Sequence, residues 1–123
     1  MNDATILNVL GISGSLRRNS LNSAALRAAQ ALAPDGMRID IVDLSAIPLY
    51  NEDVREEGLP DAVADFRRRI AAADAVLIAT PEYNYSVPGV LKNAIDWASR
   101  PRMPPKLIDA CRAARCWPSR RGS

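Results

Sequence analysis

Three short runs of strand-forming residues divide the first hundred residues of the chain. They are TILNVLGI at 5–12, MRIDIVDL at 37–44 and AVLIAT at 75–80. Each is followed, directly or after a loop, by a segment whose apolar residues recur at helical spacing. Strand followed by helix, three times over, predicts an α/β fold with a parallel sheet, because parallel neighbours are joined by right-handed crossovers through a helix. The run at 75–80 lacks polar alternation, so that strand is expected to be buried on both faces.

The helical segments indicate which side chains pack on the sheet. Ser20 is the expected N-cap of the first helix and Pro34 ends it, whereas Pro60 begins the second helix after a breaker-rich loop at 45–60. The residues expected to face the core are Leu21, Ala25, Ala28, Ala29 and Leu32 in the first helix, Val63, Phe66 and Ile70 in the second, and Val90, Leu91, Ala94, Ile95 and Ala98 in the third. Those expected in solvent are Arg67, Arg68, Arg69, Lys92, Asn93 and Asp96.

Composition limits the classes of function. A chain of 123 residues is expected to form one domain. Residues 1–98 hold nine Lys/Arg against thirteen Asp/Glu, whereas residues 99–123 hold seven against Asp109 alone. A nucleic-acid-binding role would rest on this basic tail alone and is not expected. No run reaches the about 20 apolar residues of a membrane span, and the N-terminal lead is acidic, so a cytoplasmic protein without a membrane segment is expected.

The histidine and cysteine content of the chain excludes further classes of catalytic and metal site. The chain contains no histidine, which removes a Ser-His-Asp triad and a histidine-bound metal from consideration. Cys111 and Cys116 have C-x-x-x-x-C spacing and are expected to be reduced thiols, so no metal site is predicted.

The segment GSLRRNSLN, at 14–22, joins the first strand to the first helix. Free backbone N–H groups and the helix dipole favour an anion at such a position, by about 0.3 to 1 kcal/mol for the dipole alone. Ser15, Ser20 and Asn22 can add hydrogen bonds, and Arg17 can add positive charge. The alternative is a capped helix with a surface arginine. The spacing matches neither a Walker loop nor G-x-G-x-x-G.

The segment PEYNYSVPG, at 81–89, follows the third strand. Pro81 and Pro88 stiffen its ends by fixing φ, and Gly89 allows a close approach beside the third helix. Between the prolines stand Glu82, Tyr83, Asn84 and Tyr85. Their backbone amides, side-chain amide and aromatic faces suit a flat heteroaromatic ring that is stacked at its face and hydrogen-bonded at its edge. The alternative to a ring-binding site is a structural role, in which the tyrosines cover the hydrophobic core.

GSLRRNSLN together with TPEYNYSVPGVLKNAIDW resembles the NADPH-dependent FMN reductases, a flavodoxin-like family that includes quinone, azo-dye and chromate reductases. The resemblance covers residues 5 to 101 and includes the loop at 45–60. It implies a flavodoxin-like doubly wound parallel sheet, with FMN and NADPH as cofactors and a small-molecule electron acceptor. The residues implied for the FMN phosphate are Ser15, Arg17, Ser20 and Asn22, and those implied for the isoalloxazine ring are Pro81, Glu82, Tyr83 and Asn84. No catalytic side chain is implied.

The resemblance stops after residue 101, where RMPPKLIDACRAARCWPSRRGS replaces the rest of the family's pattern. Residues 1–101 are therefore interpreted as the N-terminal part of the FMN-binding domain, with three of the five expected strands. Residues 102–123 are interpreted as a divergent basic tail, a short helix or disordered, and as the product of truncation or a shifted reading frame. An open edge at 75–80, weak stability and reduced flavin affinity are expected. The resemblance also implies a dimer or tetramer, since members of the family are typically oligomeric. The divergent C-terminal residues make such an assembly doubtful for this chain.

Three functions follow from these observations. The leading interpretation is an NAD(P)H-dependent oxidoreductase that passes hydride through FMN to quinone-, azo- or metal-type acceptors. The second is a non-catalytic remnant that binds flavin. The third is a flavodoxin-like electron carrier, which the arginines at 17 and 18 disfavour because such a carrier is expected to have an acidic rim.

Overall fold

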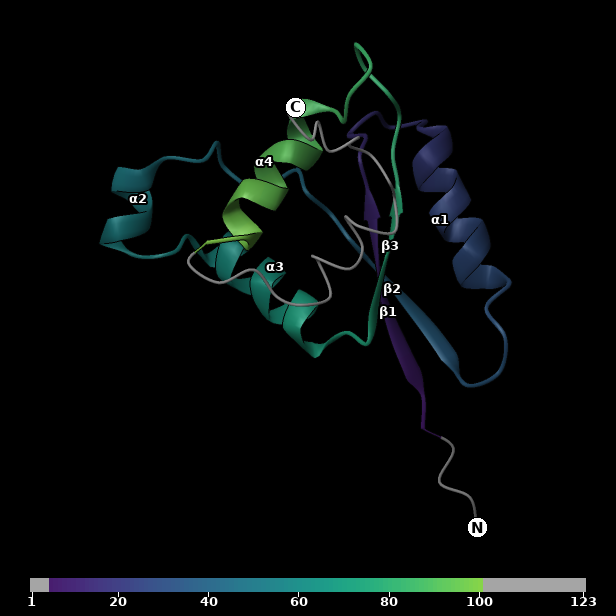
Figure 1. The fold of residues 1–123 in the computed structure, drawn as a ribbon. Helices are drawn as coiled ribbons and strands as arrows, with labels where there is room; N and C mark the ends of the chain where they lie inside the picture. The colour runs from purple at the N-terminus through teal and green to yellow at the C-terminus, as the bar shows by residue number, and fades with distance from the viewer. Residues whose placement is uncertain (1–4, 101–123) are drawn as a thin grey trace, which may run out of the picture.

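Three parallel strands form a sheet in the order β2-β1-β3. The computed structural model describes residues 5–100, and in it the strands are β1 (Leu7–Ser13), β2 (Met37–Val42) and β3 (Ala75–Ala79) (Figure 1). The central strand β1 places Leu7 opposite Met37 of β2 and Val9 opposite Ala75 of β3. The predicted α/β fold with a parallel sheet is therefore confirmed. The predicted tail at 102–123 lies outside the described residues, as do Cys111 and Cys116.

Helices cover both faces of the sheet, but unequally. Helix α1 (Leu21–Ala31) lies on one face, and α3 (Asp61–Ala72) and α4 (Gly89–Ala98) lie on the other (Figure 1). Among the described residues no helix combines the length and apolar character needed to cross a membrane.

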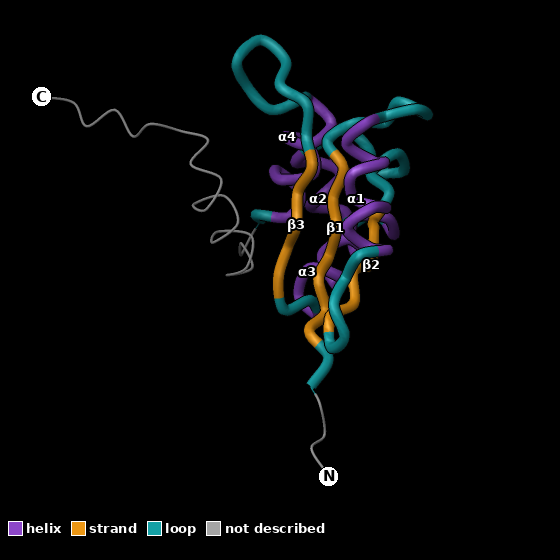
Figure 2. The backbone as a smooth tube through the Cα atoms, turned by 90° about the vertical axis from the view of Figure 1, so that its right-hand side faces the viewer, coloured by secondary structure: helices purple, strands orange, loops and turns teal. Residues whose placement is uncertain are grey.

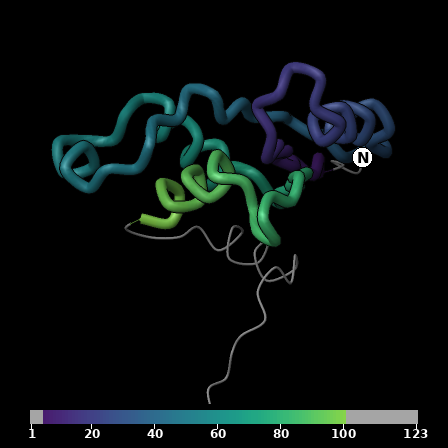
Figure 3. Tube along the Cα trace, turned by 90° about the horizontal axis from the view of Figure 1, so that it is seen from above, coloured from purple at the N-terminus to yellow at the C-terminus, as the bar shows by residue number. Residues whose placement is uncertain are grey.

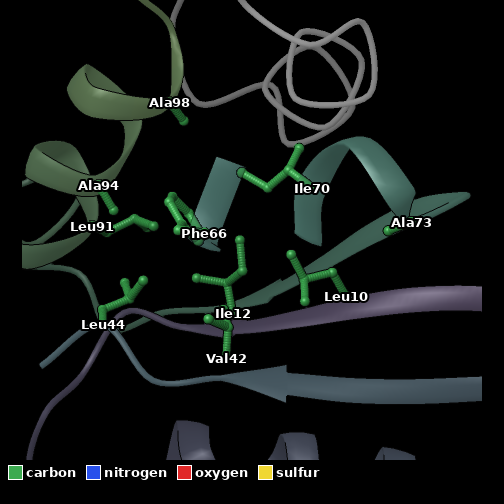
Figure 4. Packing of buried hydrophobic residues seen from close by; sticks show 10 residues of the cluster. All are labelled: Leu10, Ile12, Val42, Leu44, Phe66, Ile70, Ala73, Leu91, Ala94 and Ala98. Atoms are coloured by element: carbon green, nitrogen blue, oxygen red, sulfur yellow. The ribbon is translucent and has the colours of Figure 1, made fainter. Parts of the chain in front are cut away.

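The main core lies between the sheet and the pair α3 and α4 (Figure 4). Phe66 and Ile70 of α3 belong to this core, as the helical spacing predicts, and Val63 of the same helix is fully buried. The buried members of this cluster are Leu10, Ile12, Val42, Leu44, Phe66, Ile70, Ala73, Leu91, Ala94 and Ala98. The two elements that flank residues 80–88, β3 and α4, are thus anchored in one core.

The opposite face is covered by α1 in an orientation that the sequence did not predict. Leu21 and Leu32 are 84% and 82% exposed, Ala25 and Ala28 are also exposed, and the buried residue of the helix is Leu26. Leu26 Cδ2 lies 3.5 Å from the position that a Cβ would take on Gly11 of β1, an ordinary van der Waals distance, so Leu26 packs over this strand. Because α1 is rich in alanine, its sequence pattern does not single out one apolar face.

Strand β3 is less buried than its apolar run predicts. Its residues are half-buried except Leu77, which is 38% exposed, so the prediction of burial on both faces is wrong. Val76 and Ile78 pack against the main core on the α3 and α4 side. On the other face α1 is the one described helix, and within residues 5–100 β3 pairs with β1 alone.

The segment at 45–60, expected to be a loop, contains the short helix α2 (Glu52–Glu57). Its N-cap is Asn51, whose side chain accepts a hydrogen bond of 2.9 Å from the Asp53 backbone N–H. Glu52 and Asp53 place negative charge in the first turn, where it interacts favourably with the positive end of the helix dipole. Gly58, with φ at 133°, follows the last helical residue.

Helix α4 also holds the segment that follows β2. Asn93, expected in solvent, is half-buried; it donates to the Pro48 carbonyl at 2.8 Å and accepts from the Tyr50 N–H at 2.8 Å. Trp97, which the predicted stripe omitted, is 1% exposed, and its Nε1 donates to the same carbonyl at 2.7 Å. Val90 and Ile95 are half-buried against the core.

The three arginines of α3 are not all in solvent. Arg69 is half-buried, pairs with Asp40 of β2 at 2.7 Å and donates to the Ile41 carbonyl at 3.3 Å. Arg67 is half-buried and donates to the Arg100 carbonyl, whereas Arg68 is exposed and pairs with Asp65. Arg69 therefore ties α3 to the sheet.

Candidate functional site

Two loops meet beyond the carboxyl ends of β1 and β3. They are residues 14–20, called here the first loop, and residues 80–88, the second loop. The Gly14 N–H donates to the Ala79 carbonyl at 2.8 Å, immediately beyond the last paired residues of the two strands. Seen from above, the two loops leave the neighbouring ends of β1 and β3 in different directions, and the first loop leads into α1 (Figure 3). Ligands of open α/β sheets bind at this edge.

Hydroxyl groups hold the first loop in place. Ser13 is buried, and its Oγ donates to the Ser15 carbonyl at 3.2 Å while the Ser15 N–H donates to it at 3.3 Å. Ser13 Oγ also lies 2.9 Å from Ser23 Oγ, in a hydrogen bond in which either hydroxyl can be the donor. Ser13 thus links the end of β1, the first loop and α1.

The loop ends at the N-cap of α1. Ser20 is buried and accepts from the Ser23 N–H at 3.3 Å, which confirms the predicted cap. The Arg17 carbonyl accepts from the Ser20 N–H at 3.1 Å, and Ser15 Oγ accepts from the Arg17 N–H at 3.3 Å. Asn22 is half-buried in the first helical turn.

The electrostatics of this region suit an anion. The first turn of α1 contains no acidic residue, and the side chains of Arg17 and Arg18 are exposed beside it. The positive end of the helix dipole is therefore not neutralised by the helix itself.

The second loop is built around a strained turn. Tyr83 and Ser86 exchange two backbone hydrogen bonds, of 3.0 and 3.1 Å, and the central residues Asn84 and Tyr85 have φ of 52° and 61°. Two positive φ values are typical of a type I′ turn, in which asparagine and glycine are favoured, so Asn84 suits its position and Tyr85 does not. A tyrosine in this region of φ costs about 1 kcal/mol.

The tyrosines of this loop do not cover the core. Tyr83 is 57% exposed and Tyr85 is 97% exposed, so the alternative that they serve as core residues is wrong. Pro81 is half-buried, Pro88 is buried, and Glu82 is exposed. The loop projects past the end of the sheet with its proline-bounded base fixed between β3 and α4 (Figure 2). The turn leaves the Asn84 and Tyr85 N–H groups outside its own pair of hydrogen bonds.

Gly14 and Thr80 connect the two loops, and sequence reasoning did not single them out. A Cβ on Gly14 would lie 2.1 Å from Thr80 Oγ1 and 2.6 Å from Thr80 Cβ. The close approach was instead expected at Gly89, where a Cβ would meet nothing within 4 Å. A polar residue at the carboxyl end of an apolar strand was the available signal for Thr80.

The segment after β2 carries the shifted pKa values. The backbone and side chain of Ser45 donate to Asp43 at 2.8 and 2.7 Å and lower the pKa of its carboxyl. Tyr50 donates its hydroxyl to Glu52, which raises the pKa of the phenol and lowers that of the carboxyl. Trp97 meets the Tyr50 ring edge-on at 4.9 Å between centroids, and the Arg100 guanidinium lies 5.3 Å from the ring centroid.

The predicted site residues thus fall into two groups. Ser15, Arg17, Ser20 and Asn22 surround the N-terminus of α1, whereas Pro81, Glu82, Tyr83 and Asn84 lie along the second loop. The contacts that join the groups are the Gly14 to Ala79 hydrogen bond and the packing of Gly14 on Thr80. This arrangement can hold an elongated ligand with an anionic group at one end and a flat ring at the other.

Comparison with known sequences identifies relatives. The model of the NADPH-dependent FMN reductase family matches residues 7–114. An NAD(P)H-dependent FMN reductase of Pseudomonas aeruginosa is 67% identical over 95 residues, which cover 77% of this chain and 51% of the relative. A 2-hydroxy-1,4-benzoquinone reductase of a Burkholderia species is 48% identical over 95 residues, again 77% and 51% of the two chains. The chain spans about half the length of the curated relatives it matches.

Comparison with solved structures identifies a flavoenzyme and a further protein of the same fold. The flavoenzyme NAD(P)H:(acceptor) oxidoreductase FerB of Paracoccus denitrificans is 42% identical, with a TM-score of 0.72 over 78% of this chain and 52% of that one. An azoreductase of Bacillus anthracis, 21% identical with a TM-score of 0.59 over 77% of this chain and 56% of that one, shows the shared fold alone.

Proposed function

The chain belongs to the NADPH-dependent FMN reductase family, and we propose that its two loops bind FMN for electron transfer from NAD(P)H to a quinone-type acceptor. The observation that carries the proposal is the position of an uncompensated helix N-terminus next to an exposed loop of aromatic side chains and free N–H groups. The names of the relatives support a flavin-dependent NAD(P)H oxidoreductase.

The first loop would hold the phosphate of FMN. Ser15 and Ser20 offer hydroxyls, Asn22 offers an amide in the first turn, and Arg17 offers an exposed guanidinium. The fit rests on two features: the first turn of α1 has no carboxylate to repel a phosphate, and the cap is formed by a neutral hydroxyl. An anion there gains from the helix dipole as well as from hydrogen bonds.

The second loop would frame the isoalloxazine ring. Pro81 and Glu82 lead into the turn, Tyr83 offers an exposed ring face, and Asn84 offers an amide and a backbone N–H. Flavin, when bound, supplies the hydride chemistry, and the protein supplies orientation and polar contacts. The residues of the chain would therefore bind, orient and hydrogen-bond the flavin.

The proposed acceptor is a quinone, because relatives at 46% to 52% identity are named as quinone reductases. The azoreductases among the solved structures are 21% and 22% identical and carry no argument for azo or metal acceptors. NAD(P)H is a cytoplasmic reductant, so the cytoplasm is the proposed location.

The proposal is tested by titrating the purified chain with FMN and with riboflavin, which lacks the phosphate. We expect Arg17→Ala to weaken FMN about three- to tenfold and riboflavin by less than about twofold, because a partly exposed charge contributes about 1 kcal/mol. Arg27→Ala, an exposed arginine farther along α1, is the matched control. No binding of FMN by the wild-type chain would overturn the proposal.

The second candidate function is flavin binding without turnover, for which the first and second loops would suffice. NADPH oxidation with benzoquinone as acceptor distinguishes the two. Oxidation that depends on added FMN supports the reductase, and FMN binding without oxidation supports the binding protein.

A further inference from the structure

We propose that Gly14 and Thr80 act as a spacer that sets the distance between the first and second loops and so matches the site to a ligand that spans both. Both are positioning residues, and the role assigned to them rests on the proposed function above.

The contact between these residues has no spare room. A Cβ on Gly14 would lie 2.1 Å from Thr80 Oγ1, 2.6 Å from Thr80 Cβ and 3.1 Å from Thr80 Cα. Rotation about χ1 of Thr80 can move Oγ1 away but leaves the other two of these atoms, Cβ and Cα, in place. Any side chain at 14 would therefore push the backbones of the two loops apart, by about 1 Å if normal carbon contacts of about 3.5 Å are restored.

Each partner is fixed within its own loop. Gly14 is buried between Ser13, whose hydroxyl is anchored to α1, and the Ala79 carbonyl, which accepts its N–H at 2.8 Å. Thr80 is half-buried, and its Oγ1 donates to the Pro81 carbonyl at 3.0 Å. The spacer is therefore continuous with the hydroxyl network on one side and with the proline-bounded base of the second loop on the other.

The consequence for binding follows from linkage. FMN has a phosphate for one loop and a ring for the other, so its affinity depends on how well the separation of the loops matches its length. Lumiflavin has the ring alone and is indifferent to that separation. A change in the spacer should thus reduce the affinity for FMN selectively.

The test measures FMN and lumiflavin affinities of the full chain in parallel. We expect Gly14→Ala to weaken FMN about tenfold or more and lumiflavin by less than about twofold, since a misplacement of about 1 Å is costly for a positioned ligand. Thr80→Gly in the same chain removes Oγ1 and Cβ, and the double variant should recover FMN affinity to within about threefold of wild type. Gly89→Ala, which adds a Cβ in open space, is the matched control.

Three results would overturn the spacer: equal losses for FMN and lumiflavin, wild-type FMN affinity in Gly14→Ala, or no recovery in the double variant. A ligand-free measurement keeps the spacer testable apart from flavin binding. In NMR spectra, Gly14→Ala should shift the amide signals of the turn at 83–86, and Thr80→Gly should reverse the shift. Turn signals that do not move would overturn the spacer, whereas a wild-type chain that binds no FMN but shows this pattern would overturn only the proposed function.

Discussion

The first and second loops leave the same edge of the sheet but are held in opposite ways. Side chains hold the first loop: Ser13 is buried and hydrogen-bonded to the Ser15 backbone, and Ser20 is buried and accepts from the Ser23 N–H of α1. The backbone holds the second: two prolines bound it, and its tip is a turn with Asn84 and Tyr85 at positive φ. The first loop therefore contributes to the stability of the fold, whereas the second stores strain. Strain of this kind collects at functional sites, so the second loop carries the stronger structural sign of a ligand.

The largest expected effect is the loss of the Ser13 hydroxyl. Ser13→Ala should lower the free energy of unfolding by about 1 to 2 kcal/mol, because it leaves Ser23 Oγ and the Ser15 backbone without their buried partner. Urea denaturation followed by circular dichroism measures the change. Ser86→Ala, at an exposed serine of the second loop, is the control and should change stability by less than about 0.5 kcal/mol.

Removal of the α1 cap should have the next largest effect. Ser20→Ala should lower the free energy of unfolding by about 1 kcal/mol, because the Ser23 N–H loses its acceptor. Ser20→Asp restores a cap and should recover most of that loss in the same denaturation experiment. A Ser20→Ala variant as stable as wild type would contradict the contrast between the two loops.

The second loop should respond with the opposite sign. Tyr85→Gly should raise the free energy of unfolding by about 0.5 to 1 kcal/mol, because glycine adopts positive φ freely and the 97% exposed side chain loses no packing. Tyr83→Gly, at a residue without positive φ, should lower stability. If both variants are destabilised alike, the turn does not store strain.

The smallest expected change in the free energy of unfolding is at Asp43, in the segment after β2. The pKa of Asp43 is lowered in the folded protein by hydrogen bonds from Ser45, so the carboxylate stabilises the fold above its unfolded pKa and that contribution disappears as pH falls through the folded pKa. Asp43→Asn should lower the free energy of unfolding at pH 7 by less than about 0.5 kcal/mol, since the site is exposed. The stability of the variant, followed as pH falls from neutral, should converge with that of wild type once the pH lies below the folded pKa of Asp43.

The strands, the order of helices and the buried face of α3 could be predicted because their signal is periodic and local. Val63, Phe66 and Ile70 repeat at helical spacing among charged residues, so one face stands out. The face of α1 could not be predicted, because leucines and alanines lie on several of its sides and no local pattern selects Leu26 as the buried residue. Helix α2 was missed because its six residues depend on the Asn51 cap.

The same distinction applies to the site. Both loops were predicted as segments, since glycine, proline and hydroxyl residues follow the strands in the sequence. The assignment of individual residues to FMN remains a prediction. Contacts such as Gly14 with Thr80 depend on the register in which Ser13 pairs with Ala79, and no local pattern encodes that register.

The carbonyl of Pro48 accepts hydrogen bonds from both Asn93 and Trp97. These bonds join the end of α4 to a segment more than forty residues earlier in the chain, and Trp97 is itself 1% exposed. Local opening of α4 must therefore also release the segment around Tyr50, so the two should open as one cooperative unit in hydrogen exchange. The hydrogen bonds to Pro48 therefore restrict the opening of α4, the helix that follows the second loop, although Pro48 is not part of that loop.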